Sequence, residues 1–320
     1  MIPLEAIQSA AERIGSLVHR TPVLTSAQLG DRARTPVRLS LKCENLQKTG
    51  SFKARGALNK VLTLDAAQRA RGLVTVSAGN HAAAVAWAAK VAGCSAVVVM
   101  PTAAPRSKIE AVQGYGAEIV FHPDRTTLFD RLREVERERG LTFIHPFDDA
   151  VVLAGAGTAG LEIAEDAPEA EIVVVPTGGG GLLGGVASAI KQARPGTRVV
   201  AVELEAGPGL APALAAGKPV PAPRPDTLAD GMTPPFVGAL PLSIAREAVD
   251  EIAVVSEAEI IEAMRLLMTR AKLYVEGAGA AATAAVLAGR FAVPAGARVV
   301  ALVSGGNVDL DKVAAIGKPA

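Results

Sequence analysis

The sequence has few aromatic residues, almost no net charge and few cysteines. Each of these shortages excludes some classes of protein. Aromatic residues make up 3% of the 320 residues while apolar residues reach 50%, which favours helices of small residues packed on a valine-rich sheet. The formal net charge of +1 gives no electrostatic basis for binding nucleic acid or an acidic membrane surface. Cys43 and Cys94 lack CxxC spacing, so we expect core thiols of a cytosolic protein, not a disulfide or metal pair.

Long apolar runs and targeting signals are also missing. The longest apolar stretch, residues 82–100, is interrupted by Lys90 and splits into a helix-like and a strand-like half, so we expect no membrane span. The N-terminus has no basic segment followed by an apolar run, which argues against a signal peptide and for a cytoplasmic location. The length suits one large or two modest domains with a substantial core.

What the sequence does contain is a repeated alternation of short strand patterns and helix patterns. Strands are predicted at 37–42, 73–76, 96–100, 118–121, 142–144, 172–175, 198–203, 251–255 and 298–303. Helices are predicted at 4–16, after residue 51, and at 81–91, 106–115, 128–139, 155–165, 182–193, 257–270 and 276–288. This alternation predicts an α/β protein whose parallel-type open sheets are covered by helices on both faces.

The order of these patterns predicts two domains. Residues 1–69 and 149–320 would form a large domain, and residues 70–148 a small domain inserted in it. Residues 207–241 are rich in proline and glycine, so we expect an irregular surface excursion with short helices there.

Lys53 occupies an unusual place, the first turn of a predicted helix. Thr49-Gly50 has turn chemistry, and Ser51 is a good N-cap before apolar residues at helical spacing. A cation there opposes the positive end of the helix dipole. That field, with partial burial, would lower the pKa of the amine and make it a better nucleophile. Taken alone, Lys53 could also be a solvated surface lysine.

Three polar or glycine-rich loops follow predicted strands, where ligands bind in open α/β sheets. The first, Ser77-Ala78-Gly79-Asn80-His81, opens a helix whose free N–H groups could hold an anion. The last is Ser304-Gly305-Gly306-Asn307. Each of these two could also be an ordinary turn.

The middle loop contains four consecutive glycines, Gly178, Gly179, Gly180 and Gly181, before Leu182. Glycines let the backbone turn its amides inward, and the following helix adds its dipole, so the loop could cradle a phosphate. The run also satisfies GxGxxG, and Glu203 ends the next strand nineteen residues after Gly184, where a ribose-binding acid would sit. An NAD-dependent oxidoreductase and simple packing of helix on strand are therefore alternatives.

Together these motifs resemble the pyridoxal-phosphate (PLP) enzymes of fold type II, the tryptophan synthase β-like fold, related to threonine dehydratase and serine racemase. The resemblance extends over nearly the whole chain and includes residues 42–57, Asp148-Asp149, Gly155-Ala156-Gly157-Thr158, Ala229-Asp230-Gly231 and Glu276-Gly277-Ala278-Gly279-Ala280. In this family the lysine after Ser-Phe holds PLP covalently. The resemblance therefore implies that role for Lys53, with Phe52 packed against the cofactor.

The resemblance also implies a role for each loop. Asn80 would contact the ring hydroxyl of the cofactor and Ser304 the pyridine nitrogen. The phosphate would bind at Gly178, Gly179, Gly180, Gly181 and Leu182, and the substrate carboxylate at Ser77, Ala78, Gly79, Asn80 and His81. A neutral hydroxyl such as that of Ser304 cannot hold the pyridine nitrogen protonated, which favours prompt loss of a β-leaving group.

A divalent cation is a further implication of the resemblance. Glu203 matches a cation ligand of the serine racemase branch. That branch carries another acid a few residues on, and the corresponding stretch here is Leu204-Glu205-Ala206-Gly207-Pro208-Gly209. Glu203 is therefore the one candidate metal ligand.

Ala78 favours elimination over racemisation. Serine racemases of this family carry a serine there as the acid/base opposite the lysine, and alanine cannot transfer a proton. We therefore predict a PLP-dependent dehydratase (ammonia-lyase) that converts a β-hydroxy amino acid, L-threonine or L-serine, to a 2-oxo acid and ammonia, with Lys53 as the proton-transfer group at Cα. A racemase of the same fold, a 3-hydroxyaspartate dehydratase and a non-catalytic amino-acid-binding protein are alternatives.

Two expectations rest on the family alone or on chain length. The family implies a homodimer. The chain stops soon after the last motif, so we expect no C-terminal regulatory domain and no isoleucine feedback.

Overall fold

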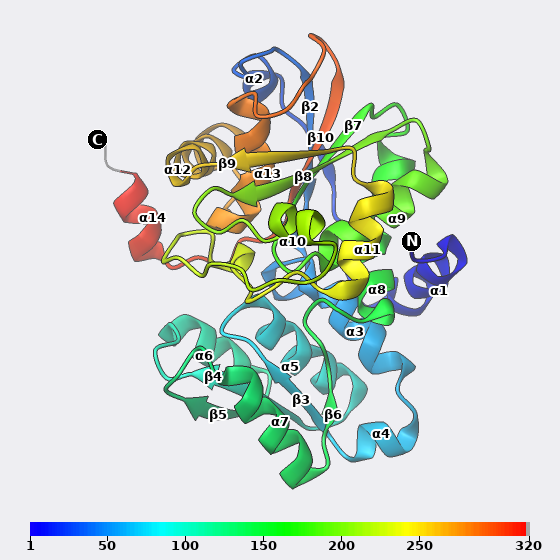
Figure 1. The fold of residues 1–320 in the computed structure, drawn as a ribbon, viewed down its shortest axis with the longest axis vertical. Helices are drawn as coiled ribbons and strands as arrows, with labels where there is room; N and C mark the ends of the chain where they lie inside the picture. Colours follow the sequence, from blue (N-terminus) through cyan, green and yellow to red (C-terminus); the bar gives the residue numbers. More distant parts are fainter. Residues whose placement is uncertain (318–320) are drawn as a thin grey trace.

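The computed structural model describes residues 1–317 and contains two sheets, one above the other in Figure 1. The larger sheet has the order β1-β2-β10-β7-β8-β9, and only β1 runs antiparallel to its neighbour. The smaller sheet has four parallel strands in the order β5-β4-β3-β6. The predicted α/β fold with parallel-type open sheets is confirmed.

The strands of the larger sheet are β1 (Val23–Thr25), β2 (Arg38–Cys43), β7 (Ile172–Pro176), β8 (Arg198–Leu204), β9 (Glu251–Val255) and β10 (Arg298–Val303). Those of the smaller sheet are β3 (Leu73–Val76), β4 (Ala96–Pro101), β5 (Glu118–His122) and β6 (Thr142–Phe143). Neither β1 nor its antiparallel pairing was predicted, because three residues carry too little periodicity.

Helices cover both faces of the larger sheet, which explains why its strands are apolar on both sides. Val299 and Ala301 of β10 face one core, whereas Val300 and Leu302 face the other. The first face packs against α2 (Ala27–Gly30), α12 (Glu257–Leu266), α13 (Gly277–Leu287) and α14 (Leu310–Ile316). The second packs against α1 (Leu4–Ile14), α8 (Ala150–Asp166), α9 (Gly181–Ala193), α10 (Leu210–Ala216) and α11 (Ala239–Ala248).

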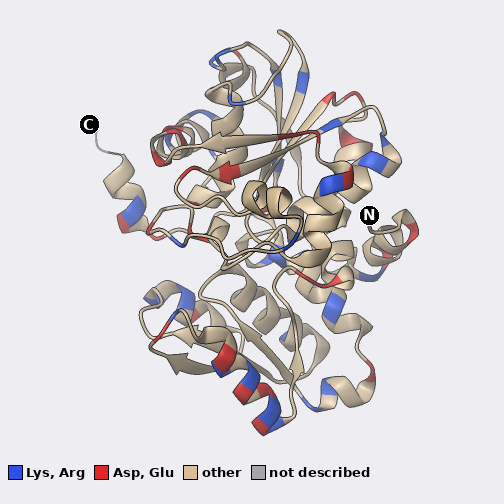
Figure 2. Ribbon diagram, in the orientation of Figure 1, with Lys and Arg blue, Asp and Glu red and all other residues tan. Residues whose placement is uncertain are grey.

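The smaller sheet is covered in the same way. One face packs against α5 (Asn80–Ala92) and α6 (Arg106–Gly114), and the other against α7 (Leu128–Arg139). Helix α7 is rich in charged residues (Figure 2), and its Arg131 pairs with Glu134 at 2.9 Å in an exposed ion pair.

Helix α3 (Lys53–Thr63) lies between the two sheets, ahead of the short α4 (Ala66–Ala70). It contacts α5 on one side and α8 on the other. Its residues Ala57, Leu58 and Val61 belong to the core of the smaller sheet, although the sequence placed this helix in the large domain. The two-domain division stays a prediction, with α3 as the element shared by both halves.

Several local predictions are wrong. Ser51 is extended (φ −162°) and pairs with Gly305 in an isolated bridge, so α3 begins without a side-chain cap. The helix predicted at 257–270 ends as α12 at Leu266 and continues as a π-helical turn, Leu267–Ala271. Lys42, predicted on a polar strand face, is fully buried.

Residues 207–241 are largely irregular, as predicted, but they contain α10, a 3-10 turn at Asp230–Met232 and the start of α11. Cys43 is a buried free thiol and Cys94 a half-buried one, in agreement with the expected core thiols. No helix within residues 1–317 is long and apolar enough to cross a membrane.

A buried ionic cluster holds α3 in place. Arg55 of α3, with 1% of its surface exposed, bonds Glu44 at 2.8 Å and Glu162 of α8 at 2.7 Å. The buried Lys42 bonds the other carboxylate oxygen of Glu162 at 2.5 Å. Burial alone would raise the pKa of Glu44, but the attraction and hydrogen bonds of Arg55 keep that pKa below its ordinary value.

We expect Arg55→Met to lower the free energy of unfolding by about 3–5 kcal/mol, because it leaves the fully buried Glu44 charge without its partner. Urea denaturation of the full chain measures this loss. The matched control is Arg106→Met, whose 91%-exposed side chain pairs with Glu110 on the surface and should change stability by less than about 1 kcal/mol. Equal losses in the two variants would contradict the assignment.

Candidate active site

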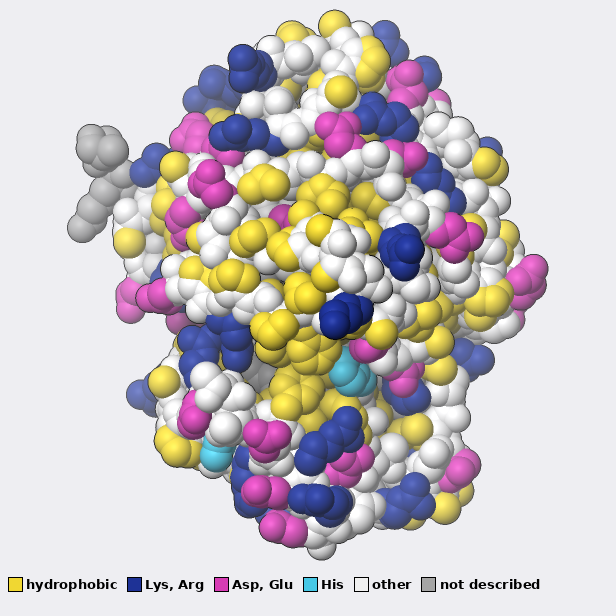
Figure 3. All heavy atoms as spheres, in the orientation of Figure 1, with side chains coloured by type: hydrophobic (Ala, Val, Ile, Leu, Met, Phe, Trp, Pro, Cys, Tyr) yellow, Lys and Arg dark blue, Asp and Glu magenta, His cyan; other side chains and the backbone are white. Residues whose placement is uncertain are grey.

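The carboxyl ends of β3, β4, β7 and β10 meet at one cavity of about 220 Å³ at the junction of the two sheets. Hydrophobic side chains gather around the hollow between the upper and lower parts of the surface (Figure 3). The cavity brings together the predicted cofactor and substrate residues: Phe52, Lys53, Ser77, Ala78, Gly79, Asn80, His81, Gly178, Gly179, Gly180, Gly181, Leu182 and Ser304. Glu203 does not line it.

Lys53 is the first residue of α3, and its amine points into this cavity. Its Nζ donates a hydrogen bond of 2.6 Å to the carbonyl of Pro146 and lies 5.1 Å from the centre of the Phe52 ring. Burial lowers the pKa of Lys53 to about 8. A substantial fraction of the amine is therefore neutral, and so nucleophilic, slightly above neutral pH.

The loop between β3 and α5 offers backbone donors to the cavity. The Ser77 hydroxyl accepts a hydrogen bond of 3.1 Å from the Gly79 N–H, which folds the loop tightly before α5 begins at Asn80. The first N–H groups of a helix have no acceptor within it. Together with the helix dipole they suit a carboxylate.

His81 adds a neutral ring beneath this loop. Its Nε2 lies 3.2 Å from the carbonyl of Ile144 and therefore carries the proton, while the buried Nδ1 has no hydrogen-bond partner among residues 1–317. Burial first, and the nearby Lys53 charge second, hold the pKa of His81 well below its ordinary value. His81 is thus uncharged at neutral pH.

The glycine loop after β7 is shaped as a cradle that larger residues could not form. A Cβ on Gly179 would lie 2.3 Å from the Phe147 ring, and Gly180 has a φ of +87°, which strongly favours glycine. Helix α9 starts at Gly181, so unpaired N–H groups and the positive dipole end meet there. This arrangement fits a phosphate.

Ser304 closes the set of polar groups. It is buried, and its hydroxyl donates 3.2 Å to the carbonyl of Ala278. A hydroxyl hydrogen can rotate, so the same group could instead donate to an unprotonated ring nitrogen. Each of these groups suits one part of PLP. The Lys53 amine suits the aldehyde, and the N–H cradle suits the phosphate. The Asn80 amide suits the ring hydroxyl, and the Ser304 hydroxyl suits the ring nitrogen. The donor set therefore fits that cofactor.

The cavity is also lined by charged side chains whose place there was not predicted from the sequence. Glu276 is 3% exposed and accepts 2.6 Å from Asn80 Nδ2. Lys108 of α6 pairs with Asp230 at 2.6 Å across the junction of the sheets. Glu276 stands before an alanine- and glycine-rich helix, and nothing in the local sequence distinguishes it from an ordinary helix-start acid.

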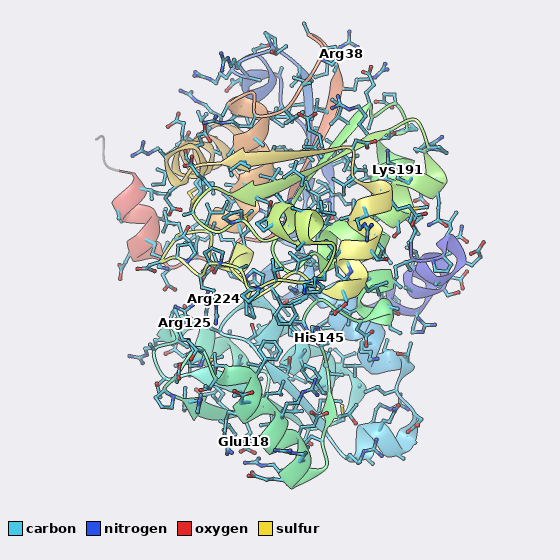
Figure 4. All side chains as sticks on the ribbon, viewed as in Figure 1. Arg38, Glu118, Arg125, His145, Lys191 and Arg224 are labelled. Carbon is cyan, nitrogen blue, oxygen red and sulfur yellow. The ribbon has the colours of Figure 1, made fainter. Side chains whose placement is uncertain are left out.

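Two arginines lie beside each other at the cavity (Figure 4). Arg224 donates 3.0 Å to the backbone carbonyl of Arg125. Burial and the Arg125 charge lower the pKa of Arg224. Arg125 is exposed, and it also belongs to the cavity wall. Only the tertiary fold brings these irregular segments together.

The segment after β6 links the sheets, as predicted. His145 (labelled in Figure 4) stands 4.9 Å from the Phe147 ring, and burial lowers the pKa of His145 to about 4. Asp149 caps α8 through the N–H of Val151 at 2.8 Å, and Asp148 accepts from the first N–H groups of α11. These acids are structural caps.

Glu203 does not fit a divalent cation. Its Oε1 accepts 2.6 Å from the Gly209 N–H and also bonds the Leu210 N–H, and its Oε2 accepts 2.9 Å from Ala211. Both oxygens thus cap the start of α10. Within residues 1–317 no group of three or more His, Cys, Asp or Glu side chains could hold a metal ion. The same cap removes the basis for a ribose-binding acid, because both oxygens of Glu203 are already bonded to backbone N–H groups.

Several known proteins are similar to this chain over nearly its whole length. An L-threonine ammonia-lyase of Thermotoga maritima is 43% identical over 98% of this chain and 77% of that protein. A solved threonine deaminase, from T.th., has a TM-score of 0.89 and 44% identity, covering 96% of this chain and 98% of that one. Maize serine racemase has a TM-score of 0.92 and 38% identity, covering 98% and 95%. Residues 14–305 match the family described as pyridoxal-phosphate dependent enzyme, and the chain belongs to this family, with PLP as its cofactor.

Proposed function

We propose that this protein is a dehydratase (ammonia-lyase) that converts a β-hydroxy amino acid, L-threonine or L-serine, to a 2-oxo acid and ammonia by α,β-elimination. The observation that carries the proposal is the pairing of a buried, readily deprotonated Lys53 amine with Ala78 across one cavity. The relatives named threonine ammonia-lyase and threonine deaminase support it.

We assign the cavity residues as follows. Lys53 holds the cofactor, Phe52 packs beside it, and the glycine cradle with Leu182 holds the phosphate. Asn80 takes the ring hydroxyl and Ser304 the ring nitrogen. The substrate carboxylate lies on the N–H groups of the loop formed by Ser77, Ala78, Gly79, Asn80 and His81.

The bound cofactor supplies an electron sink for the pair released at the substrate Cα. The N–H groups at the start of α5 orient the substrate through its carboxylate. The Lys53 amine, once freed, takes the proton from Cα, since its lowered pKa leaves it partly neutral near pH 8. The β-hydroxyl takes up one proton as its bond to Cβ breaks and leaves as water, which balances the proton taken from Cα. One water then hydrolyses the released enamine to a 2-oxo acid and ammonia.

Racemisation is less well supported, although maize serine racemase is a close structural neighbour. Inverting Cα needs a proton donor on the face opposite the lysine, and the Ala78 methyl group cannot supply one. Incubating the holoenzyme with threonine, serine and 3-hydroxyaspartate, and measuring 2-oxo acids and D-amino acids, separates the two reactions and ranks the substrates. Formation of D-serine without 2-oxo acid would overturn the proposed elimination.

We also propose that the enzyme acts in the cytoplasm as a homodimer. The two free thiols suit a reducing compartment. The dimer rests on the family resemblance, and size-exclusion chromatography with light scattering tests it.

We expect Lys53→Ala to lower turnover by at least about 10³-fold, because it removes both the cofactor anchor and the base. Borohydride should trap the cofactor on the wild-type protein and not on the variant, as mass spectrometry of the intact chain would show. Lys90→Ala, at an exposed position of α5, is the control and should keep both properties. Full activity in the Lys53 variant would refute the assignment.

The rate at which the full-length apoprotein captures PLP should rise about tenfold per pH unit and level off above about pH 8. Only the neutral amine attacks the aldehyde, and burial lowers the pKa of Lys53 to about 8. Stopped-flow absorbance at several pH values measures this profile. A rate still rising above pH 10 would mean an ordinary, solvated lysine.

We expect Ala78→Ser to add measurable serine racemisation while elimination continues, because a hydroxyl then faces the cavity opposite Lys53. Chiral chromatography of the reaction mixture measures D-serine. The control Ala83→Ser places the same hydroxyl on α5, three residues after Asn80 and outside the cavity lining, and should form none. If neither variant racemises serine, the missing hydroxyl alone does not decide the reaction.

A further inference from the structure

A chain of hydrogen bonds runs from the loop before Lys53 to a buried acid in the cavity wall. Asn307 Nδ2 donates 2.7 Å to the carbonyl of Thr49 and 2.8 Å to Asn80 Oδ1. Asn80 Nδ2 in turn donates 2.6 Å to Glu276 Oε1. Three loops that are distant in sequence therefore meet at the Asn80 amide.

This chain fixes which way the Asn80 amide points. A side-chain amide has one acceptor oxygen and two N–H donors. Asn307 donates one N–H group to the Thr49 carbonyl and the other to Asn80. The Asn80 oxygen must therefore face Asn307. Glu276 takes one of the two N–H groups of Asn80. This leaves the second N–H group of Asn80 for the cavity, which Asn80 lines.

The backbone is shaped to fit these side chains. A Cβ on Gly305 would lie 2.3 Å from Glu276 Oε1, and a Cβ on Gly50 would lie 2.3 Å from Asn307 Oδ1. Thr49 adopts a left-handed conformation (φ 59°), which is costly for a β-branched residue. The bond from Asn307 to the Thr49 carbonyl helps to hold that conformation.

We propose that Glu276 is a positioning residue for the cofactor: together with Asn307 it clamps the Asn80 amide so that one N–H faces the ring hydroxyl. The inference deepens the proposed function by naming a residue that acts on PLP through another. It requires PLP in the cavity, which the family supplies, and does not require a particular substrate.

The charges around Glu276 are compatible with this role. Burial and the Asp230 charge raise the pKa of Glu276 to about 7, while the Lys108 charge and the Asn80 bond act in the opposite direction. The acid is thus partly protonated at neutral pH. A carboxyl group and a carboxylate both offer an oxygen that accepts from Asn80, so the clamp holds in either form.

The test compares two cofactors on the full-length protein, PLP and its 3-deoxy analogue, which lacks the ring hydroxyl. Glu276→Ala should weaken PLP binding roughly tenfold, as expected for one lost hydrogen bond, and leave the analogue's affinity unchanged. Asn80→Ala should behave in the same way, and the double variant should lose no more than either single variant. Fluorescence titration at one fixed pH gives the dissociation constants.

Glu276→Gln is the conservative variant, because its amide oxygen can still accept from Asn80, and it should restore PLP affinity to within about twofold of wild type. Glu203→Ala, a buried acid outside the cavity, is the control and should not separate the two cofactors. Equal losses for PLP and the analogue in Glu276→Ala, or no loss for either, would overturn the proposal. If the wild-type protein binds PLP but shows no dehydratase activity, the proposed function is wrong. The comparison of PLP with its 3-deoxy analogue would still test the role of Glu276.

Discussion

The position of the reactive amine depends on the ion cluster around Arg55. This one side chain joins α3 to Glu44 before the Lys53 loop and to Glu162 on α8. It also reaches the backbone carbonyl of His19 at 3.2 Å. A buried cluster of this kind adds little net stability compared with apolar packing, since desolvation offsets the attraction. Its geometry is nevertheless demanding, and we interpret it as the device that sets the register of α3 between the two sheets.

Burial, and not the helix dipole, is the main reason that Lys53 can act as a nucleophile and base. A helix terminus contributes about 0.3–1 kcal/mol at an exposed site, less than one pKa unit. The pKa of Lys53 falls from 10.5 to about 8, and burial is its cause. The bond to the Pro146 carbonyl favours the charged form and acts against this fall. Lys53 lies in the first turn of α3, as predicted, but burial lowers its pKa more than the helix dipole does.

The sequence predicts the alternating architecture and most of the cavity because both depend on short-range patterns. Apolar runs indicate strands buried on both faces, and a loop at the carboxyl end of a parallel strand must face the ligand side of the sheet. The glycine loop, the Asn80 loop and Ser304 were found in this way. The glycine loop and Ser304 are neighbours because β10 pairs with β7, whereas the Asn80 loop reaches the cavity from the smaller sheet.

The residues that the sequence missed are those whose partners lie far along the chain. Ser51 has the side chain of an N-cap, yet a bridge to Gly305 holds it extended. Glu276 and Asn80 are 196 residues apart. Local sequence reports what a side chain is able to do, while the long-range fold decides which of those abilities is used.

The same fold serves lyases and racemases, so the choice of reaction must lie in a few atoms of the cavity. In the proposed mechanism Lys53 provides the proton-transfer group at Cα, and Ala78, which lines the same cavity, provides only a methyl group. A carbanion at Cα then has two fates, reprotonation by Lys53 or loss of the β-hydroxyl. Return of the proton from Lys53 only restores the substrate, whereas loss of the hydroxyl leads forward. In the proposed mechanism, the absence of one hydroxyl group at position 78 therefore favours elimination over racemisation.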